Sequence, residues 1–285
     1  ASYSNMLTNT TPDILHDKIV MTLRHFMKSA GRDKVVIGLS GGIDSAVVAT
    51  IAVNALGSES VSGILMPSPF STLHSVTDAV ELAENLQIRY NTVPIEAIFH
   101  KYMRELTDLF GEEPGRLTVE NLQARIRSTI LMACTNQTGA LLLNTSNKSE
   151  MSMGYGTLYG DLSGAVMVIG DIYKLDVYEL ARYMNSLKRS IPDSTMTKEP
   201  SAELSVGQKD SDSIPPYDVL DPILYSLNEG GKTPEEIVAS GVDKKLVDRI
   251  ICLRNSASFK GAQLPPMIQV GEYPLLPANK CISCK

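Results

Sequence analysis

The stretch 40–45, with the sequence SGGIDS, combines residue types that could bind a phosphate together with a metal ion. Its two glycines leave backbone amides uncovered, and the hydroxyls of Ser40 and Ser45 add hydrogen-bond donors. A helix starting here would add about half a positive charge at its first turn. The carboxylate of Asp44 would repel a phosphate, but it suits Mg²⁺, which pairs one or two carboxylates with substrate phosphates. The stretch therefore predicts a phosphate site with a divalent cation.

Two common nucleotide-binding loops do not fit this stretch. No lysine follows the glycines, as it does in the Gly-Lys-Ser/Thr loop of many nucleotide-binding proteins. The three spaced glycines of the dinucleotide fingerprint are also missing. The alternative to a phosphate site is an ordinary glycine-rich turn between a strand and a helix.

Apolar runs on both sides of the loop predict the elements that position it. Residues 35–39 are short, apolar and β-branched, which indicates a buried strand, and residues 44–56 indicate a buried, alanine-rich helix. Further strands are expected at 60–66, 90–95, 140–143 and 166–169, and further helices at 13–30, 74–86, 95–110, 118–136 and 173–187. This alternation predicts a doubly wound, Rossmann-like parallel sheet with helices on both faces. Ligands bind beyond the carboxyl ends of such strands, where the 40–45 loop and the 67–71 loop both lie.

The remaining segments predict the surroundings of the site. Residues 144–150, with the sequence NTSNKSE, form a polar stretch directly after a strand, a position where loops often carry chemistry. Residues 191–216 are rich in proline, serine and charge, which favours a mobile flap over the site, although a passive surface loop has a similar composition. Residues 219–227 and 235–256 predict a small helical region, and 260–285 an extended tail. We expect all of residues 1–285 to form a single domain.

Composition limits the classes of function. The 285 residues are 43% hydrophobic and 20% charged, and the formal net charge is −6, which disfavours a nucleic-acid partner. No apolar run has the roughly 20 residues that a membrane span needs, and we predict no secretory signal and no membrane partner.

Cys134 and Cys252 lie in apolar helical patterns and are expected to be buried thiols. The Cys281–Cys284 pair supplies half of the ligands of a structural zinc and is expected in a disordered tail. Without a disulfide framework, a cytoplasmic location is expected.

Five separated motifs give the chain a resemblance to a known enzyme family. The SGGIDS stretch resembles the PP-loop of the ATP pyrophosphatases, which split ATP between its α and β phosphates. Over about residues 13–266 the chain is similar to the NAD synthetases. The motif sequences are most similar to those in the synthetase domain of the glutamine-dependent members. The motifs are GLSGGIDS at 38–45, NLQARIR at 121–127, NTSNKSE at 144–150, GYGTLYGD at 154–161 and KEPSAEL at 198–204.

This resemblance implies a two-step amidation that needs ATP, Mg²⁺ and ammonia. The carboxylate of deamido-NAD attacks the α-phosphorus of ATP, pyrophosphate leaves, and ammonia then displaces AMP to give NAD. A carboxylate is a poor acyl donor, and adenylation turns its oxygen into a leaving group. Positioned charges must stabilise the triphosphate as it breaks. The family also implies a homodimer.

The resemblance implies roles for individual residues. Asp44, Lys174 and Glu150 are expected to be catalytic, with Asp44 and Glu150 holding Mg²⁺. The residues expected to bind ATP are Gly38, Leu39, Ser40, Gly41, Gly42, Ile43, Asp44, Ser45, Thr145, Lys174 and Ser201. Those expected to bind deamido-NAD are Asn121, Arg125, Glu150 and Lys260. From their sequence positions alone, Asn121, Arg125 and Lys174 also fit exposed helix surface, Glu150 fits a helix cap, and Lys260 fits an irregular tail.

Two departures from the family bear on the nitrogen donor. Many ammonia-dependent members carry a lysine where Leu158 stands and an aspartate near Ala165. Glutamine-dependent members carry a glutaminase domain with a catalytic cysteine, for which there is no room before Asp13. We therefore expect ammonia to arrive free, or the glutaminase part to have been cut away or to reside on another chain.

Two other hypotheses about the function of the 40–45 loop stay open. The same loop could activate another acceptor, namely a nucleobase, a tRNA or a sulfur carrier. It could also serve a non-catalytic adenine-nucleotide-binding module. Such a module would not need the carboxylates of Asp44 and Glu150 beside the phosphates.

Overall fold

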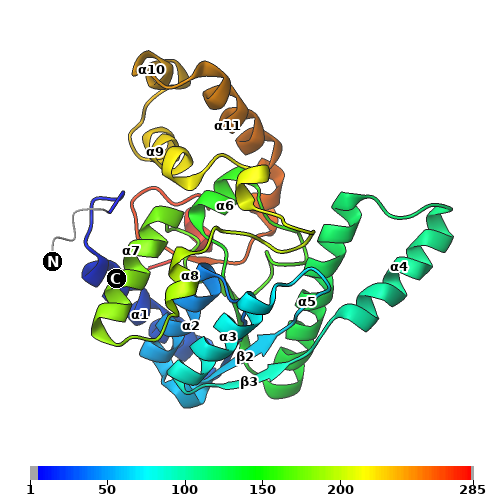
Figure 1. The fold of residues 1–285 in the computed structure, drawn as a ribbon. Coiled ribbons are helices and arrows are strands. Elements are labelled where there is room, and N and C mark those ends of the chain that lie inside the picture. The colour runs from blue at the N-terminus through cyan, green and yellow to red at the C-terminus, as the bar shows by residue number, and fades with distance from the viewer. Residues whose placement is uncertain (1–5, 284–285) are drawn as a thin grey trace.

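A sheet of seven parallel strands forms the centre of the computed structural model, which describes residues 6–283 (Figure 1). The strands are β1 Val35–Gly38, β2 Val61–Leu65, β3 Arg89–Thr92, β4 Leu141–Asn144, β5 Val166–Met167, β6 Met267–Ile268 and β7 Cys281–Ile282. Their order is β3-β2-β1-β4-β5-β6-β7. The chain thus runs outward from β1 to β3 and then returns to pair β4 on the other side of β1. This reversal is the switch point beside which doubly wound sheets bind their ligands.

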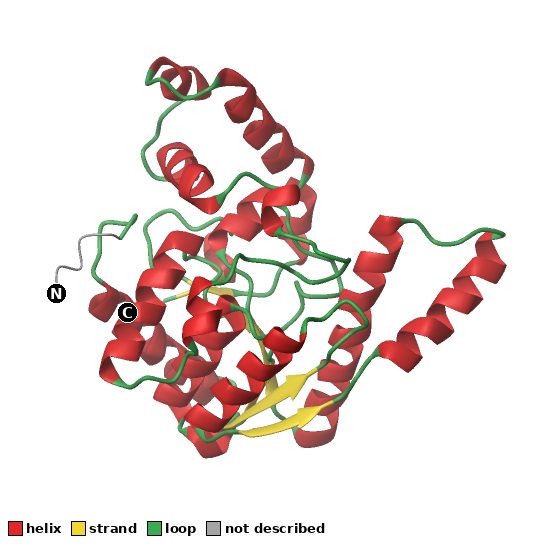
Figure 2. Cartoon of the chain, in the orientation of Figure 1, coloured by secondary structure: helices red, strands yellow, loops and turns green. Residues whose placement is uncertain are grey.

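Helices cover both faces of the sheet, as predicted (Figure 2). The helices around the sheet are α1 Pro12–Ser29, α2 Ile43–Leu56, α3 Leu73–Leu86, α4 Glu96–Phe110, α5 Arg116–Thr138, α6 Lys148–Met153, α7 Lys174–Leu187 and α8 Asp193–Thr197. One core contains residues of α1, α2, α3 and α7, and a second core contains residues of α4 and α5. The doubly wound α/β fold expected from the alternation is therefore confirmed.

Strand β1 illustrates how the sequence produces this arrangement. Val35 and Ile37 are buried in the core shared with α1, α2 and α7, whereas Val36 is buried in the opposite core against Ile126 and Leu131 of α5. Successive side chains of a strand point to opposite faces, so a strand covered on both faces must be apolar throughout. The loop that follows β1 is consequently anchored at the middle of the sheet.

A small group of three helices stands beside the carboxyl ends of the strands (Figure 1). It consists of α9 Tyr217–Asn228, α10 Pro234–Ala239 and α11 Lys244–Ser256. Its core joins Leu220 and Leu224 of α9 to Val247 of α11, and it also includes Met153 of α6 and the residue before α7, Tyr173. The group therefore packs directly on α6 and on the start of α7, the two helices that carry Glu150 and Lys174.

The C-terminal segment corrects the prediction of an extended tail at 260–285. Residues Ser258–Gln263 and Ala278–Lys280 form 3₁₀ turns, η3 and η4, and β6 and β7 add two parallel strands to the sheet. Cys281 is therefore in a strand that pairs with Met267 rather than in a disordered tail, while Cys284 lies outside the described residues. Strands of two residues are too short for a hydrophobic period, which is why the pattern did not reveal them.

Other local predictions also need correction. Cys252 is exposed and Cys134 half-buried, so neither is the buried thiol expected. Helix α5 begins at Arg116, and its N-cap is Gly115, three residues before the predicted N-cap Thr118. Helix α6 begins inside the polar stretch 144–150, because Asn147 caps it. Within residues 6–283, no helix combines the length and the apolar character that crossing a membrane requires.

Candidate active site

The loop between β1 and α2 is a tight turn that lines a cavity. Gly41 has a φ of +81°, and a Cβ there would lie only 2.7 Å from the carbonyl carbon of Ser75, so this position requires glycine. The hydroxyl of Ser45 donates to the carbonyl of Gly42 at 3.3 Å and accepts from the amide of Ser40 at 3.3 Å. The amide of Gly42 donates to the Ser40 hydroxyl at 3.2 Å. With Gly42 as N-cap, the positive end of α2 opens into the cavity.

A cluster of charged side chains lies at this helix start. The ammonium group of Lys174, at the start of α7, donates to Oδ2 of Asp44 and lies 3.9 Å from Oε1 of Glu150. Asn147 donates from Nδ2 to Oδ1 of Asp44 at 3.0 Å. Glu150 also closes a capping box on α6, since its Oε2 accepts from the amide of Asn147 at 3.4 Å. The structure thus brings the three predicted catalytic residues together from three separate elements.

The electrostatics of this cluster favour a further cation. Burial and the neighbouring charge of Asp44 raise the pKa of Glu150 well above its usual value, while Lys174 opposes that rise. Burial lowers the pKa of Lys174, but Asp44 and Glu150 outweigh it and hold that pKa above its usual range. Mg²⁺ takes one or two carboxylates as ligands when phosphates supply the others, and Asp44 and Glu150 are two carboxylates beside the phosphate loop. The residues present therefore fit the predicted metal.

A cavity of about 300 Å³ extends from this cluster across the switch point. The predicted residues that line it are Gly38, Leu39, Ser40, Gly42, Ile43, Asp44, Ser45, Thr145, Glu150, Lys174 and Ser201. Gly41 is buried behind the lining, against Ser75, so it allows the tight turn but does not form part of the cavity wall. Most of the ATP-binding residues expected from the motifs are thus gathered at one cavity.

The cavity also contains residues that the sequence reasoning missed. Arg127 lines it and donates from Nε to the carbonyl of Met66 at 2.9 Å, and burial lowers the pKa of Arg127 to about 10. Tyr155 and Asp210 line it too and are joined by a hydrogen bond of 3.1 Å. Helical spacing could have identified Arg127, because Ala124, Arg127 and Leu131 recur on one face of α5.

Three residues predicted to bind deamido-NAD lie away from the cavity lining. Asn121 accepts from Thr157 at 2.8 Å, and Arg125 donates to the carbonyl of Leu158 at 3.1 Å. Lys260 donates to the carbonyls of Gly154 and Gly156 at 2.9 and 2.8 Å, and burial lowers its pKa. All three therefore gather on the 154–161 loop. Arg125 is exposed because it lies two positions, about 200° around the helix, from Arg127.

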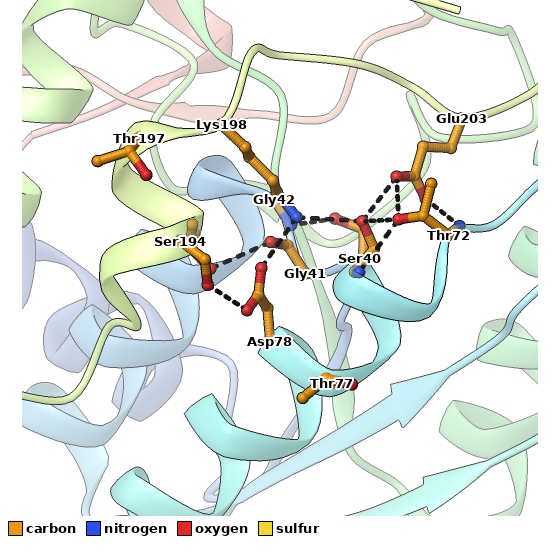
Figure 3. A network of polar contacts seen from close by, with 12 residues as sticks. Ser40, Gly41, Gly42, Thr72, Thr77, Asp78, Ser194, Thr197, Lys198 and Glu203 are labelled. Carbon is orange, nitrogen blue, oxygen red and sulfur yellow. Dashed lines mark hydrogen bonds and ion pairs between the residues drawn. The ribbon is translucent and has the colours of Figure 1, made fainter. Parts of the chain in front are cut away.

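The segment predicted as a flap lies over the phosphate loop and contains two ordered elements, α8 and the 3₁₀ turn η2 Asp210–Asp212. Figure 3 shows Lys198 and Glu203 reaching from this segment to the start of α3. Lys198 donates to Ser75 at 3.0 Å and pairs with Asp78 at 3.3 Å. Glu203 accepts from Ser75 at 2.7 Å and from Thr72 at 2.9 Å. These contacts give a closed arrangement, while mobility of the segment stays a prediction.

Fold and site together define a class, the doubly wound α/β proteins that bind a nucleotide phosphate at a glycine-rich loop beside the switch point. Within that class, the family model described as NAD synthase matches residues 15–264. The chain belongs to the NAD synthase family.

Curated relatives agree with this assignment. A glutamine-dependent NAD(+) synthetase of Synechocystis sp. is 48% identical over 256 residues, which are 90% of this chain and 46% of the relative. The enzyme of the same name from Thermotoga maritima is 50% identical over 232 residues, covering 80% of this chain and 40% of the relative. The chain therefore spans about half the length of the curated relatives it matches.

Solved structures are similar as well. An NH3-dependent NAD synthetase of Campylobacter jejuni matches with a TM-score of 0.73 and 29% identity over 91% of this chain and 100% of the other. An NMN synthetase of Francisella tularensis matches with a TM-score of 0.77 and 29% identity, covering 88% and 96% of the two chains. A glutamine-dependent NAD+ synthetase of Acinetobacter baumannii, in complex with ADP, matches with a TM-score of 0.65 and 38% identity over 93% and 48%.

Proposed function

We propose that this chain catalyses the ATP-dependent amidation of deamido-NAD to NAD, with ammonia as the nitrogen donor. The observation that carries the proposal is the Asp44–Lys174–Glu150 cluster, which stands beside the amides of the phosphate loop at the start of α2. A carboxylate pair beside a phosphate site suits a reaction that breaks the triphosphate, whereas passive binding of a nucleotide would not need it. The substrates, ATP and a dinucleotide, fit a cytoplasmic location.

Each step uses residues of this cluster. A carboxylate oxygen of deamido-NAD attacks the α-phosphorus of ATP, and the bond to pyrophosphate breaks. Ser40, Ser45 and the loop amides hold the departing pyrophosphate, while Lys174 offers its ammonium group to the phosphate oxygens. Asp44 and Glu150 would hold Mg²⁺, which supplies positive charge to the triphosphate when it is bound. Ammonia then attacks the activated carbonyl carbon, AMP leaves, and the nitrogen loses a proton.

The 154–161 loop is the proposed support for deamido-NAD. Asn121, Arg125 and Lys260 converge on it from α5 and η3. Arg125 and Lys260 bring two positive charges, which suit the diphosphate of a dinucleotide. We also propose a homodimer through the hairpin of α4 and α5, which projects from the body of the molecule (Figure 1). Large apolar side chains are exposed along it, at Ile98, Tyr102, Leu109, Phe110, Leu117 and Met132.

The nitrogen source is tested by one comparison of reaction mixtures. Purified chain with deamido-NAD, ATP and Mg²⁺ receives either ammonium or glutamine, and NAD is quantified. We expect NAD with ammonium, because the proposed second step takes ammonia directly, and at least about a hundredfold less NAD with glutamine. A third mixture replaces deamido-NAD with the corresponding mononucleotide. NAD at equal rates from both nitrogen donors would contradict the proposal that ammonia is the donor. Product in the third mixture alone would show that the acceptor is the mononucleotide and not deamido-NAD.

Two arginines on α5 separate the two proposed subsites. Arg127→Met should weaken ATP binding about tenfold, since it removes a half-buried cation from the cavity wall. Arg125→Met should leave ATP binding unchanged and raise the KM for deamido-NAD about tenfold. Calorimetric titration with ATP and initial rates against deamido-NAD measure the two effects. An equal loss of ATP affinity in both variants would remove the distinction between the subsites.

A further inference from the structure

Asp221, on α9, is a wholly buried carboxylate that lies between the starts of two other helices. Its exposed fraction is 0%, and its Oδ1 accepts from the hydroxyl of Ser149 on α6 at 2.6 Å. Its Oδ2 accepts from the amide of Leu175 on α7 at 2.9 Å. The Ser149 hydroxyl in turn accepts from the amide of Lys174 at 2.9 Å. One carboxylate therefore connects α6, α7 and α9.

These contacts satisfy amides that a helix cannot satisfy by itself. The first amides of an α-helix lack acceptors within the helix, so a side chain at the N-cap usually supplies one. At α7 the N-cap is Tyr173, whose hydroxyl instead accepts from Asn228 at 3.1 Å. Asp221 and Ser149 supply the missing acceptors for Leu175 and Lys174 from outside the helix. A negative charge is also favourable at this positive helix end.

We propose that Asp221 is a positioning residue that fixes Lys174 and Glu150 relative to each other at the active site. Lys174 is the first residue of α7, and Glu150 directly follows Ser149 in α6. Because the Asp221 carboxylate is hydrogen-bonded to the starts of both helices, it determines the position of the Lys174 ammonium group relative to Asp44 and Glu150. The three-helix group of α9, α10 and α11 thereby supports the site through this carboxylate as well as through its apolar core. The kinetic part of this proposal rests on the proposed function, whereas its structural part does not.

The burial of Asp221 supports a role beyond packing. Burial raises the pKa of Asp221 to about 6, and the hydrogen bonds from Ser149 and Leu175 oppose that shift. A buried carboxylate costs free energy unless hydrogen bonds compensate it, and here those bonds come from residues at the starts of α6 and α7. A carboxylate at this position is therefore explained by the groups that it orients.

The test compares Asp221→Leu with wild type by amide hydrogen exchange and by kinetics. We expect the amides of Lys174 and Leu175 to exchange at least about tenfold faster in the variant. Leu175 loses its acceptor, and Ser149, the acceptor of the Lys174 amide, loses the carboxylate that orients its hydroxyl. We expect kcat for NAD formation to fall about tenfold while the KM for ATP stays within about twofold, since the displaced residues act on the reacting groups. Asp221→Asn, which keeps an acceptor for Leu175, should recover part of kcat.

Asp218→Leu is the matched control, because Asp218 is exposed on the first turn of the same helix, and it should change neither measurement. If Asp221→Leu does not fold, Ser149→Ala tests the proposal instead. We expect the Lys174 amide to exchange faster in this variant and kcat to be lower. Unchanged exchange, or faster exchange with an unchanged kcat, would overturn the proposal. If wild type forms no NAD, the exchange measurement still tests the contact, and only the proposed function fails.

Discussion

Asp44→Ala is expected to lower the rate of NAD formation about 10³-fold. Asp44 accepts hydrogen bonds from Lys174 and Asn147 and stands at the first turn of α2, where the triphosphate is proposed to bind. Its loss removes one of the two proposed metal ligands and frees Lys174 to pair with Glu150 alone. Electrostatic stabilisation of a developing charge is commonly worth two to three orders of magnitude for one group. Initial rates with ammonium at saturating ATP measure the effect.

The dependence on Mg²⁺ separates this effect from a general loss of folding. The variant should need a higher Mg²⁺ concentration for half-maximal rate if Asp44 is a metal ligand. Asp33→Ala is the matched control, because Asp33 is exposed just before β1 and should leave both the rate and the Mg²⁺ dependence unchanged. Full turnover in Asp44→Ala would make the metal role of Asp44 wrong.

Gly41→Ala is expected to abolish ATP binding and to destabilise the fold. The φ of +81° is strained for alanine, and the added methyl group would collide with the backbone of Ser75, whose Cα would lie 2.8 Å away. Backbone cannot move aside as a flexible side chain can, so the loop and the start of α3 must separate. Both carry contacts to the flap, including the bond from Thr195 to the carbonyl of Gly41 at 3.2 Å. Chemical denaturation and ATP titration measure the two losses.

Gly57→Ala is a matched control on the other end of α2. Gly57 has a similar φ of +88°, but among the described residues no heavy atom lies within 4 Å of the Cβ that would be added. This variant should lower the free energy of unfolding by about 1–3 kcal/mol, the strain of a backbone conformation that is essentially restricted to glycine, and bind ATP normally. Equal losses in the two variants would show that strain alone, without the collision, explains Gly41.

The sequence pattern predicted the fold class well because hydrophobic periods are local. The run at 35–39 and the helical stripes at 13–30 and 74–86 lie within a residue or two of β1, α1 and α3. Prediction failed where an element was too short to have a period. Strands β6 and β7 form because the edge of the sheet offers them partners, which no pattern at 260–285 contains.

The site was predicted unevenly for a related reason. The phosphate loop is one contiguous stretch, so its residues stay together in any fold, and Asp44 and Ser45 line the cavity as expected. Arg125 and Arg127 are close in sequence but lie on different faces of α5, and only Arg127 reaches the cavity. The flap contacts from Lys198 to α3 join segments that are more than a hundred residues apart.

By itself, the sequence determined the phosphate loop, the parallel sheet that carries it and the family to which the chain belongs, since each rests on contiguous residues and local periods. Only the tertiary structure decided that Lys174 meets Asp44, that Arg127 rather than Arg125 lines the cavity, and that Asp221 caps α7. These contacts depend on how whole helices pack against one another, and a fraction of a helical turn is enough to change which side chain arrives.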